Sequence, residues 1–168
     1  LGLGFSPETE ETKLQDSFQG LHHQFVASAL AVKAGHEIIP GSQIGCMLIY
    51  APTYSYDSNP ENVLHALQEE RLFNNYCGDV QVRGAYPAFA NRFFKENGIN
   101  LEIKDGDLEI IKEGTVDFIS FSYYMSRTDK KNKTPEEIGQ GNLIGGVKNP
   151  FLSASDWGWE IDPTGLRI

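Results

Sequence analysis

The sequence predicts an α/β fold with parallel strands, and three observations lead to this prediction. First, helical and strand-like segments follow one another in the order helix, strand, helices, strand. Second, Ile44–Tyr50 is an apolar run without alternation, which is typical of a parallel strand buried on both faces. Third, 168 residues with 40% hydrophobic and 22% charged side chains have the size and composition of a globular protein.

The first expected helix runs from Ser17 to His36, with capping side chains at Asp16 and Ser17. Its apolar residues recur at helical spacing. They form one stripe, which comprises Phe18, Leu21, Phe25, Ala29 and Val32. This stripe predicts the buried face of an amphipathic helix.

A second helix is expected to begin at Asn59-Pro60-Glu61. Asn59 is a capping residue, Pro60 suits the first turn, and the charge of Glu61 suits the positive end of a helix. The buried side of this helix is expected to consist of Val63, Leu64 and Leu67.

The rest of the chain adds two helices, a strand and a loop. The helices are expected at Pro87–Asn97, where Gly98 is the stop signal, and at Asp107–Glu113. The second strand is Val116–Tyr124. The polar segment Ser126–Pro150 is interpreted as one long surface loop, and such loops are usually functional or mobile. Its glycines are Gly139, Gly141, Gly145 and Gly146.

The two strands need partners that the sequence does not contain. Two parallel strands cannot close a barrel or cover their own edges. Asp162-Pro163 has the character of a helix start, yet the sequence ends at Ile168, within about two turns. We therefore expect residues 1–168 to be an internal segment of a longer protein, without a complete independent domain.

Charge and cysteine content exclude several classes of function. The net charge is −9 and no block of Lys or Arg is present, so a nucleic-acid surface is not expected. No apolar run approaches the roughly 20 residues of a membrane helix. Cys46 and Cys77 form no Cys-x-x-Cys pair, and the four histidines have no zinc-site spacing. The cysteines are interpreted as structural thiols of a protein from a reducing cytoplasm.

Five stretches, in one consistent order and spacing, resemble family 1 glycoside hydrolases and specifically their 6-phospho-β-glucosidase branch. They are Leu21–Val32, Ile44–Leu48 with Ala51–Tyr54, Asp79–Pro87, Glu113–Ser126, and Asn149–Pro163. The resemblance implies a (β/α)8 TIM barrel, of which this chain supplies the region of strands five and six with their helices. It also implies a retaining β-glycosidase that hydrolyses 6-phospho-β-glucosides in carbohydrate catabolism.

Retaining glycosidases use two carboxyl groups about 5–5.5 Å apart, one as acid/base and one as nucleophile. In the family, the acid/base Glu follows an Asn after strand four, and the nucleophile lies in Glu-Asn-Gly after strand seven. The sequence contains no Asn-Glu dipeptide. Glu96-Asn97-Gly98 matches the second motif, but it ends an amphipathic helix instead of a strand, so Glu96 is not taken as the nucleophile. Both catalytic glutamates are therefore expected outside this chain, which alone should be inactive.

Tyr124 is the candidate auxiliary catalytic residue. Alternation along Val116–Tyr124 places Ser122 and Tyr124 on the inward face and Ile119 and Phe121 on the helix-facing side. Tyr124 falls at the carboxyl end of the strand, where the active sites of such barrels lie. The resemblance implies that its hydroxyl contacts the nucleophile. The alternative is a packed aromatic ring with a solvated hydroxyl.

Within the implied barrel, three residues are substrate-binding candidates. Tyr54 follows strand five and would line the aglycone entrance. Ser122 stands where many family members carry Asn, and Trp157 offers an aromatic face to a sugar. Trp159 is interpreted as packing, and structural roles are expected for His22 and His23.

Several alternatives remain open. The phosphate-recognition loop of this branch would lie beyond Ile168, so the nearest enzyme alternatives are an unphosphorylated β-glucosidase and a 6-phospho-β-galactosidase. The alternative from another class is a non-catalytic sugar-binding fragment. No metal or organic cofactor is implied, because protonation and carboxylate attack suffice. The expected partners are the substrate and the remainder of the parent barrel, without nucleic acid or membrane. A homo-oligomer also remains open.

Overall fold

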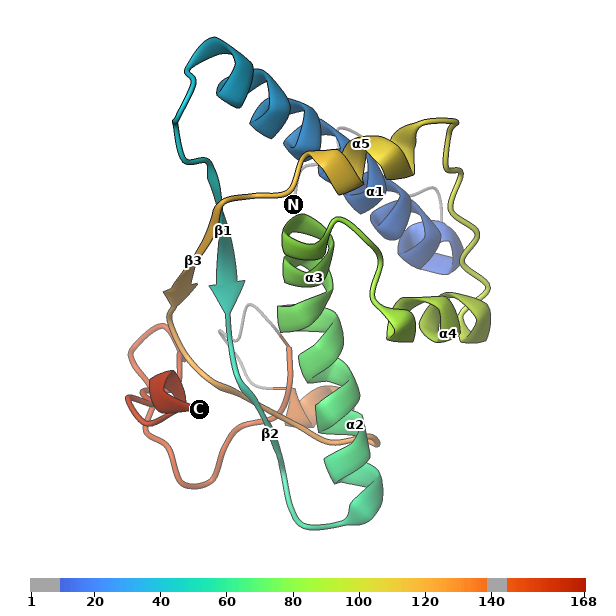
Figure 1. The fold of residues 1–168 in the computed structure, drawn as a ribbon. Helices are drawn as coiled ribbons and strands as arrows, with labels where there is room; N and C mark the ends of the chain where they lie inside the picture. Colours follow the sequence, from blue (N-terminus) through green and yellow to red (C-terminus); the bar gives the residue numbers. More distant parts are fainter. Residues whose placement is uncertain (1–9, 139–144) are drawn as a thin grey trace. The chain divides into compact units, whose positions relative to one another are not determined.

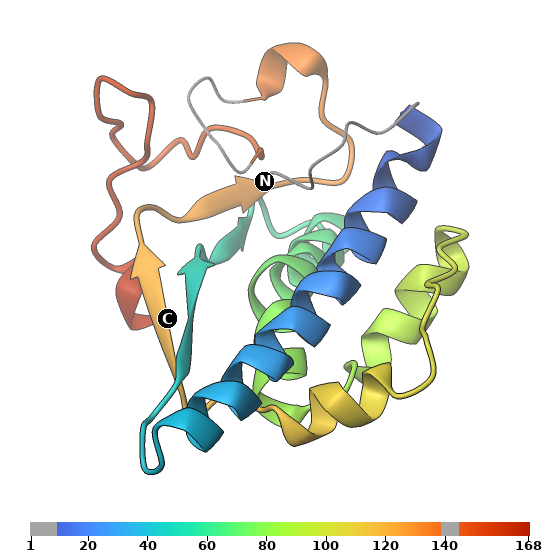
Figure 2. The same cartoon turned by 90° about the horizontal axis from the view of Figure 1, so that it is seen from above.

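The computed structural model describes residues 10–138 and 145–168 of the chain (Figures 1 and 2). The chain divides into two compact units, Leu1–Cys46 with Tyr76–Ser120 and Met47–Asn75 with Phe121–Ile168. The described elements follow the predicted order of helix, strand, helices and strand, with an additional short strand after each predicted one. None of the helices in the described part combines the length and apolar character that a membrane crossing requires.

The first unit is built from four helices around an aromatic core. The helices are α1 (Glu10–Ile38), α3 (Tyr76–Arg83), α4 (Ala88–Glu96) and α5 (Asp107–Glu113). Phe25, Tyr76 and Val80 are buried together with Ala90 and Ile111. Several aromatic rings meet edge to face, among them those of Phe18 and Tyr76 with 5.3 Å between centroids. This packing stabilises the unit by removing large apolar surfaces from water.

The predicted stripe of the first helix is confirmed by burial. Phe25, Ala29 and Val32 are 5%, 3% and 3% exposed. The helix is longer than predicted, because it begins at Glu10 and ends at Ile38. The predicted range of α5 agrees with the structure, and α4 stops before Gly98, whose φ of 65° is left-handed.

The second unit contains short strands packed beside a helix. Its elements include β2 (Thr53–Ser55), α2 (Pro60–Glu70), the π-helical turn η1 (Arg71–Asn75) and β4 (Arg127–Asp129). β2 and β4 are parallel, with Thr53 opposite Arg127 and Ser55 opposite Asp129. The unit also contains two short 3₁₀ helices, η2 (Pro135–Glu137) and η3 (Gly165–Arg167).

The two predicted strands are neighbours in one sheet. β1 (Gly45–Tyr50) pairs with β3 (Phe118–Tyr123), and their arrows point the same way in Figures 1 and 2. The expected burial on both faces is wrong for this chain. Met47 is 63% exposed, and the expected helix-facing residues Ile119 and Phe121 are 43% and 53% exposed. The reason is that, within residues 10–138 and 145–168, this sheet consists of β1 and β3 alone.

A paired amide bridges the end of β1 and the start of β2. The Asn74 side chain donates to the carbonyl oxygen of Ala51 at 2.9 Å, and its amide oxygen accepts from the Ala51 N–H at 3.1 Å. The next residue, Pro52, accepts from the Arg127 N–H at 2.7 Å, so pairing resumes at once with β4. Both backbone groups of Ala51, which is 1% exposed, are therefore satisfied.

Two predictions about the second unit are wrong. Val63, Leu64 and Leu67 are exposed by 47%, 56% and 45%, whereas Ala66 is buried. The polar face of α2 packs inward instead, since Glu70 accepts a hydrogen bond from the Thr53 N–H in β2 at 2.7 Å. The predicted cap is confirmed, because the Asn59 side chain accepts from the Glu61 N–H at 3.0 Å.

The second error concerns Ser126–Pro150, which is not one surface loop. Arg127–Asp129 forms the buried strand β4, and Pro135–Glu137 forms a 3₁₀ helix with a capping box at Thr134. Paired charges allow polar residues to lie inside the protein, which the composition of the segment did not reveal. Gly139 and Gly141 lie outside the described residues. The expected helix after Asp162-Pro163 is a turn followed by the short η3.

Candidate functional site

An open hollow lies in the second unit just beyond the carboxyl end of β3. Its volume is about 350 Å³. It is lined by Tyr123, Tyr124, Ser155, Trp159, Glu160, Ile161, Asp162 and Pro163. Aromatic faces combined with two carboxyl groups suit a ligand with both apolar and hydroxyl surfaces.

Tyr124 and Trp159 form the aromatic wall of this hollow. Their rings meet nearly edge to face, with centroids 5.6 Å apart and an interplanar angle of 63°. Trp159 is carried by a small hairpin in which Ala154 bridges Glu160 in antiparallel fashion. The Ser155 N–H donates to the Trp159 carbonyl at 2.8 Å, which closes the turn of the hairpin. The position of the Trp159 ring therefore depends on where this hairpin is anchored.

The anchor of the hairpin is Asp162, which is 6% exposed. One carboxylate oxygen, Oδ2, accepts from the Tyr54 hydroxyl at 2.8 Å. The other, Oδ1, accepts from the backbone N–H groups of Thr164 and Gly165, both at 3.1 Å. The backbone carbonyl of Asp162 accepts from the Tyr123 hydroxyl at 2.5 Å. Burial alone would raise the pKa of Asp162, but donors such as Tyr54 outweigh it and hold the pKa below its ordinary value.

Glu160 is the second acidic residue of the hollow, and it is 4% exposed. Its Oε1 accepts from the Asn149 N–H at 2.5 Å, whereas Oε2 has no hydrogen-bond partner among the described residues. Burial raises the pKa of this carboxyl above its ordinary value. Of the two acids of the hollow, Glu160 therefore has a raised pKa and Asp162 a lowered pKa.

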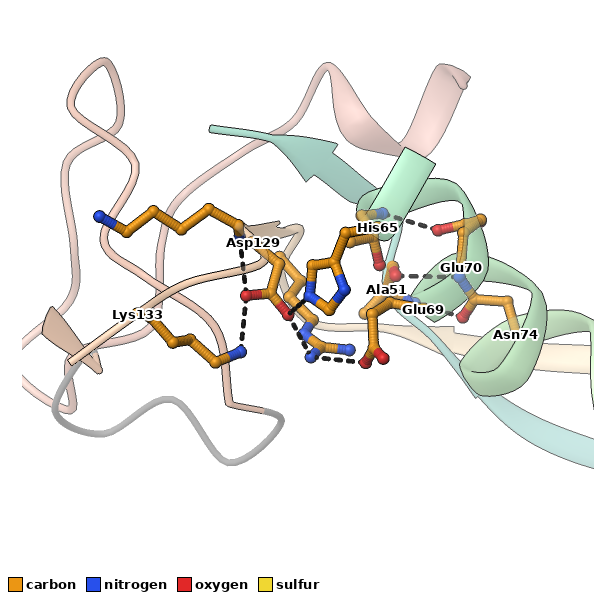
Figure 3. Close-up of polar contacts among 10 residues, drawn as sticks. Ala51, His65, Glu69, Glu70, Asn74, Asp129 and Lys133 are labelled. Carbon is orange, nitrogen blue, oxygen red and sulfur yellow. Dashed lines mark hydrogen bonds and ion pairs between the residues drawn. The ribbon is translucent and has the colours of Figure 1, made fainter. Parts of the chain in front are cut away.

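A buried ionic cluster lies in the same unit, between β4 and helix α2 (Figure 3). Asp129 is fully buried at its centre. Its Oδ2 accepts from Arg127 at 2.7 Å, and its Oδ1 accepts from Lys133 at 2.6 Å. His65 Nε2 lies 3.4 Å from Oδ2, and Arg127 also donates to Glu69 on α2 at 3.0 Å. The cluster thereby ties β4 and the segment after it to α2.

The neighbours of Asp129 stabilise the ionised form of its carboxyl group. Its burial alone would raise the pKa of its carboxyl, but hydrogen bonding from Lys133 and the positive charge of Arg127 bring the pKa below its ordinary value. A buried carboxylate is tolerated only when its charge is paired and its oxygens accept hydrogen bonds. Asp129 meets both conditions.

The fold and these contacts can be compared with known proteins. A model of glycosyl hydrolase family 1 matches residues 2–168. The chain belongs to glycosyl hydrolase family 1. It is 54% identical to an aryl-phospho-β-D-glucosidase of Bacillus subtilis and 45% identical to a 6-phospho-β-glucosidase of Clostridium longisporum. These alignments cover 99% and 100% of this chain and 35% of each relative. The chain thus spans about a third of the length of the curated relatives it matches.

A solved family 1 structure has the same fold over this region. The psychrophilic β-glucosidase from Micrococcus antarcticus superposes with a TM-score of 0.77 and 25% identity, over 91% of this chain and 35% of that one. The chain accordingly has the fold of one part of a family 1 TIM barrel, which confirms the resemblance inferred from the sequence motifs.

Family membership gives the sequence-predicted residues their context. Tyr124 is 56% exposed and lines the hollow, one residue beyond the end of β3 at Tyr123. The Ser122 hydroxyl contacts Met47 Sδ at 3.6 Å on β1. Tyr54 is half-buried, and its hydroxyl is bonded to Asp162. Trp157 is 80% exposed and does not line the hollow. The structure therefore brings Tyr124 into the hollow, whereas Trp157 projects elsewhere.

Residues without a predicted catalytic role also have clear positions. Glu96 ends helix α4 and accepts from Arg92 at 2.7 Å, so it lies on a helix as expected and not on a strand. His22 is fully buried, with 2.7 Å from Nδ1 to the Tyr86 hydroxyl and 3.0 Å from Nε2 to Asp107. This arrangement confirms the structural role expected for His22. Burial raises the pKa of Cys77 to about 11, which suits an unreactive thiol.

Sequence reasoning missed Asp162, Glu160 and the cluster around Asp129. Asp162 was interpreted only as a helix cap, although it also receives a tyrosine hydroxyl from β2. A signal was available for Asp129, because the sequence Arg127-Thr128-Asp129 places two opposite charges on the same side of a strand. The packing role expected for Trp159 agrees with the contact of its ring with Tyr124 at the wall of the hollow.

Proposed function

We propose that this chain is part of a retaining β-glycosidase that hydrolyses 6-phospho-β-glucosides in the cytoplasm. The observation that carries the proposal is the 45–54% identity to phospho-β-glucosidases over nearly the whole chain. A 6-phospho-β-galactosidase of Streptococcus pneumoniae is only 28% identical. The gluco-configured substrate is therefore favoured over the galacto-configured one.

The chain would contribute support to the chemistry and not the two reacting carboxylates. In the whole barrel, Tyr124 would donate a hydrogen bond to the nucleophile and stabilise its charge. Ser122, Tyr54 and Trp157 would contribute to the substrate site, the last two around the aglycone or sugar faces. No residue of this chain is assigned as nucleophile or acid/base. The remaining part of the barrel would supply both.

The proposal is tested with the full-length parent protein and a matched set of chromogenic substrates. The set contains a 6-phospho-β-glucoside, the unphosphorylated β-glucoside and a 6-phospho-β-galactoside with the same leaving group. We expect kcat/KM to be highest for the first by at least about 100-fold, since a charged group that loses its ion-pair partner in a buried site costs several kcal/mol. Equal turnover of the unphosphorylated glucoside would contradict the phosphate preference, and no turnover of any would contradict the enzyme assignment.

A further inference from the structure

Asp162 joins three separate parts of the second unit through its own atoms. Its side chain accepts from Tyr54 of β2 and from the backbone of the turn at Thr164 and Gly165. Its main-chain carbonyl accepts from Tyr123 of β3. Because a buried carboxylate must be hydrogen-bonded to be tolerated, these donors define one position for the residue.

The turn that follows Asp162 is packed closely against two side chains. A Cβ atom added at Gly165 would lie 2.3 Å from the Tyr123 hydroxyl and 2.6 Å from Asp162 Oδ2. Only a glycine allows the backbone to approach both groups. The two tyrosine hydroxyls and this turn therefore enclose Asp162 from different sides.

The hairpin that ends at Asp162 carries the ring that contacts Tyr124. The Ile161 N–H donates to the Ser153 carbonyl at 2.8 Å, so the hairpin remains paired up to the residue before Asp162. Trp159 lies three residues before Asp162, and its ring is 5.6 Å from that of Tyr124. Tyr124 directly follows Tyr123, whose hydroxyl is bonded to the same aspartate. A displacement of Asp162 would therefore alter both the wall against Tyr124 and the strand end that carries it.

We infer that Asp162 is a positioning residue for Tyr124. Its four hydrogen bonds fix the Trp159 hairpin against the end of β3, and the Trp159 ring in turn restricts the ring of Tyr124 to the direction in which its hydroxyl meets the nucleophile. This inference rests on the proposed function for its catalytic consequence. The arrangement of the rings does not depend on that function. Asp162 itself does not need to touch the substrate.

The test is a double-mutant cycle in the full-length parent protein. Asp162→Asn keeps the size of the side chain but puts a donor or a neutral oxygen where the charged oxygens were. We expect a roughly 10-fold fall in kcat/KM, mostly in kcat, which is below the about 100-fold that a 1 Å misplacement can cause. In a Tyr124→Phe background the same substitution should lower kcat/KM by less than about 2-fold, since residues acting as one unit are not additive. Equal effects in both backgrounds would overturn the inference.

Tyr54→Phe provides the second arm, because it removes one hydroxyl and leaves the ring, so folding should be preserved even if Asp162→Asn does not fold. It should show the same dependence on Tyr124, with a smaller fall in kcat/KM. Tyr56→Phe is the matched control in the same unit. Tyr56 is 42% exposed and does not line the hollow, so its variant should keep wild-type kcat and KM. A fall in the control equal to that of Tyr54→Phe would also overturn the inference.

Two further readouts separate positioning from general loss of stability. The acid limb of the kcat/KM profile should move upward in Asp162→Asn, because a nucleophile that loses a hydrogen-bond donor has a raised pKa. A crystal structure of the Tyr54→Phe parent should show the Tyr124 and Trp159 rings displaced from their 5.6 Å contact. Unchanged rings would overturn the inference. A parent without glycosidase activity would instead overturn the proposed function, and the ring geometry would still test the positioning.

Discussion

Asp129 offers the sharpest test of how the second unit is stabilised. Asp129→Asn preserves the shape of the side chain and removes its charge. Arg127 would keep one acidic partner, Glu69, at 3.0 Å, whereas Lys133 would lose the carboxylate that it now contacts at 2.6 Å. The variant thus leaves a buried cluster with an excess of positive charge.

The magnitude follows from the burial of the partners. Removing one member of a buried ion pair costs about 3–5 kcal/mol. The side chain of Arg127 is only 7% exposed, which favours a loss of stability at the upper end of this range. Lys133 is 26% exposed, so water can solvate part of its charge and reduce the loss. We therefore expect a loss near the lower end, about 3 kcal/mol. With a denaturation slope of about 3 kcal/mol/M, the urea midpoint should fall by about 1 M.

The assay is urea denaturation of the full-length parent protein, followed by fluorescence at neutral pH. Glu61→Gln is the matched control, since it also removes one negative charge from the same unit. Glu61 is 65% exposed, and its 3.5 Å contact with Lys131 is an exposed pair, so its midpoint should hardly change. A midpoint for Asp129→Asn equal to that of the wild type, or equal to that of the control, would refute the reasoning.

The difference in stability between the wild type and Asp129→Asn should depend on pH in a defined direction. The folded-state pKa of Asp129 is lowered, because Lys133 and Arg127 outweigh the opposing effect of burial. Its contribution to stability is therefore fully present above the ordinary carboxyl pKa of the unfolded chain and is lost as pH falls through the folded-state pKa. The gap between the wild type and Asp129→Asn should close on acidification, and a gap that widened instead would contradict this assignment.

Three further predictions concern the hollow and the chain as a whole. In the full-length parent, Tyr124→Phe should lower kcat/KM roughly 10- to 150-fold with little change in Tm, since a hydrogen bond to a carboxylate contributes about 1.5–3 kcal/mol. Ser122→Ala should lower kcat/KM less, because among the described groups the Ser122 hydroxyl contacts only Met47 Sδ. A larger loss for Ser122→Ala than for Tyr124→Phe would reassign the chemistry to the serine. Gly165→Ala should destabilise the parent by about 1–3 kcal/mol through the overlap at Tyr123 and Asp162, and an unchanged Tm would show that the turn can relax. The isolated 168-residue chain should not hydrolyse a 6-phospho-β-glucoside above background, and turnover that depends on Glu96 would overturn its exclusion.

Local signals predicted several elements of the fold well. The α5 helix has the predicted bounds, and the cap at Asn59 forms as expected, because capping and stop signals act over a few residues. The neighbouring strands β1 and β3 were also predicted, β1 as a continuous apolar run and β3 as a segment with alternating side chains, although β3 ends at Tyr123 and not at Tyr124.

The rest depends on partners that are distant in the sequence. The strands β2 and β4 have three residues each, too few for a periodic pattern, and they form only because they pair with each other. The charges of Arg127 and Asp129 suggested solvent exposure, yet they neutralise each other inside the protein. For the hollow, the sequence predicted Tyr124 at the carboxyl end of a strand, and Tyr124 lies one residue beyond β3. The role of Asp162 required knowledge of which hydroxyl groups converge on it.

The contact between Asn74 and Ala51 has a consequence for how the backbone changes partners. Along this stretch, the chain leaves the ladder with β3 at Tyr50 and joins the ladder with β4 at Thr53. Such an exchange normally leaves a peptide group between two sheets without a hydrogen-bond partner. The carboxamide of Asn74 supplies one donor and one acceptor, so it substitutes for a missing strand at this single position. On the partner side, Tyr124 lies between the end of β3 at Tyr123 and the start of β4 at Arg127, outside both ladders. The two sheets can therefore exchange strands here while both backbone groups of Ala51 remain hydrogen-bonded.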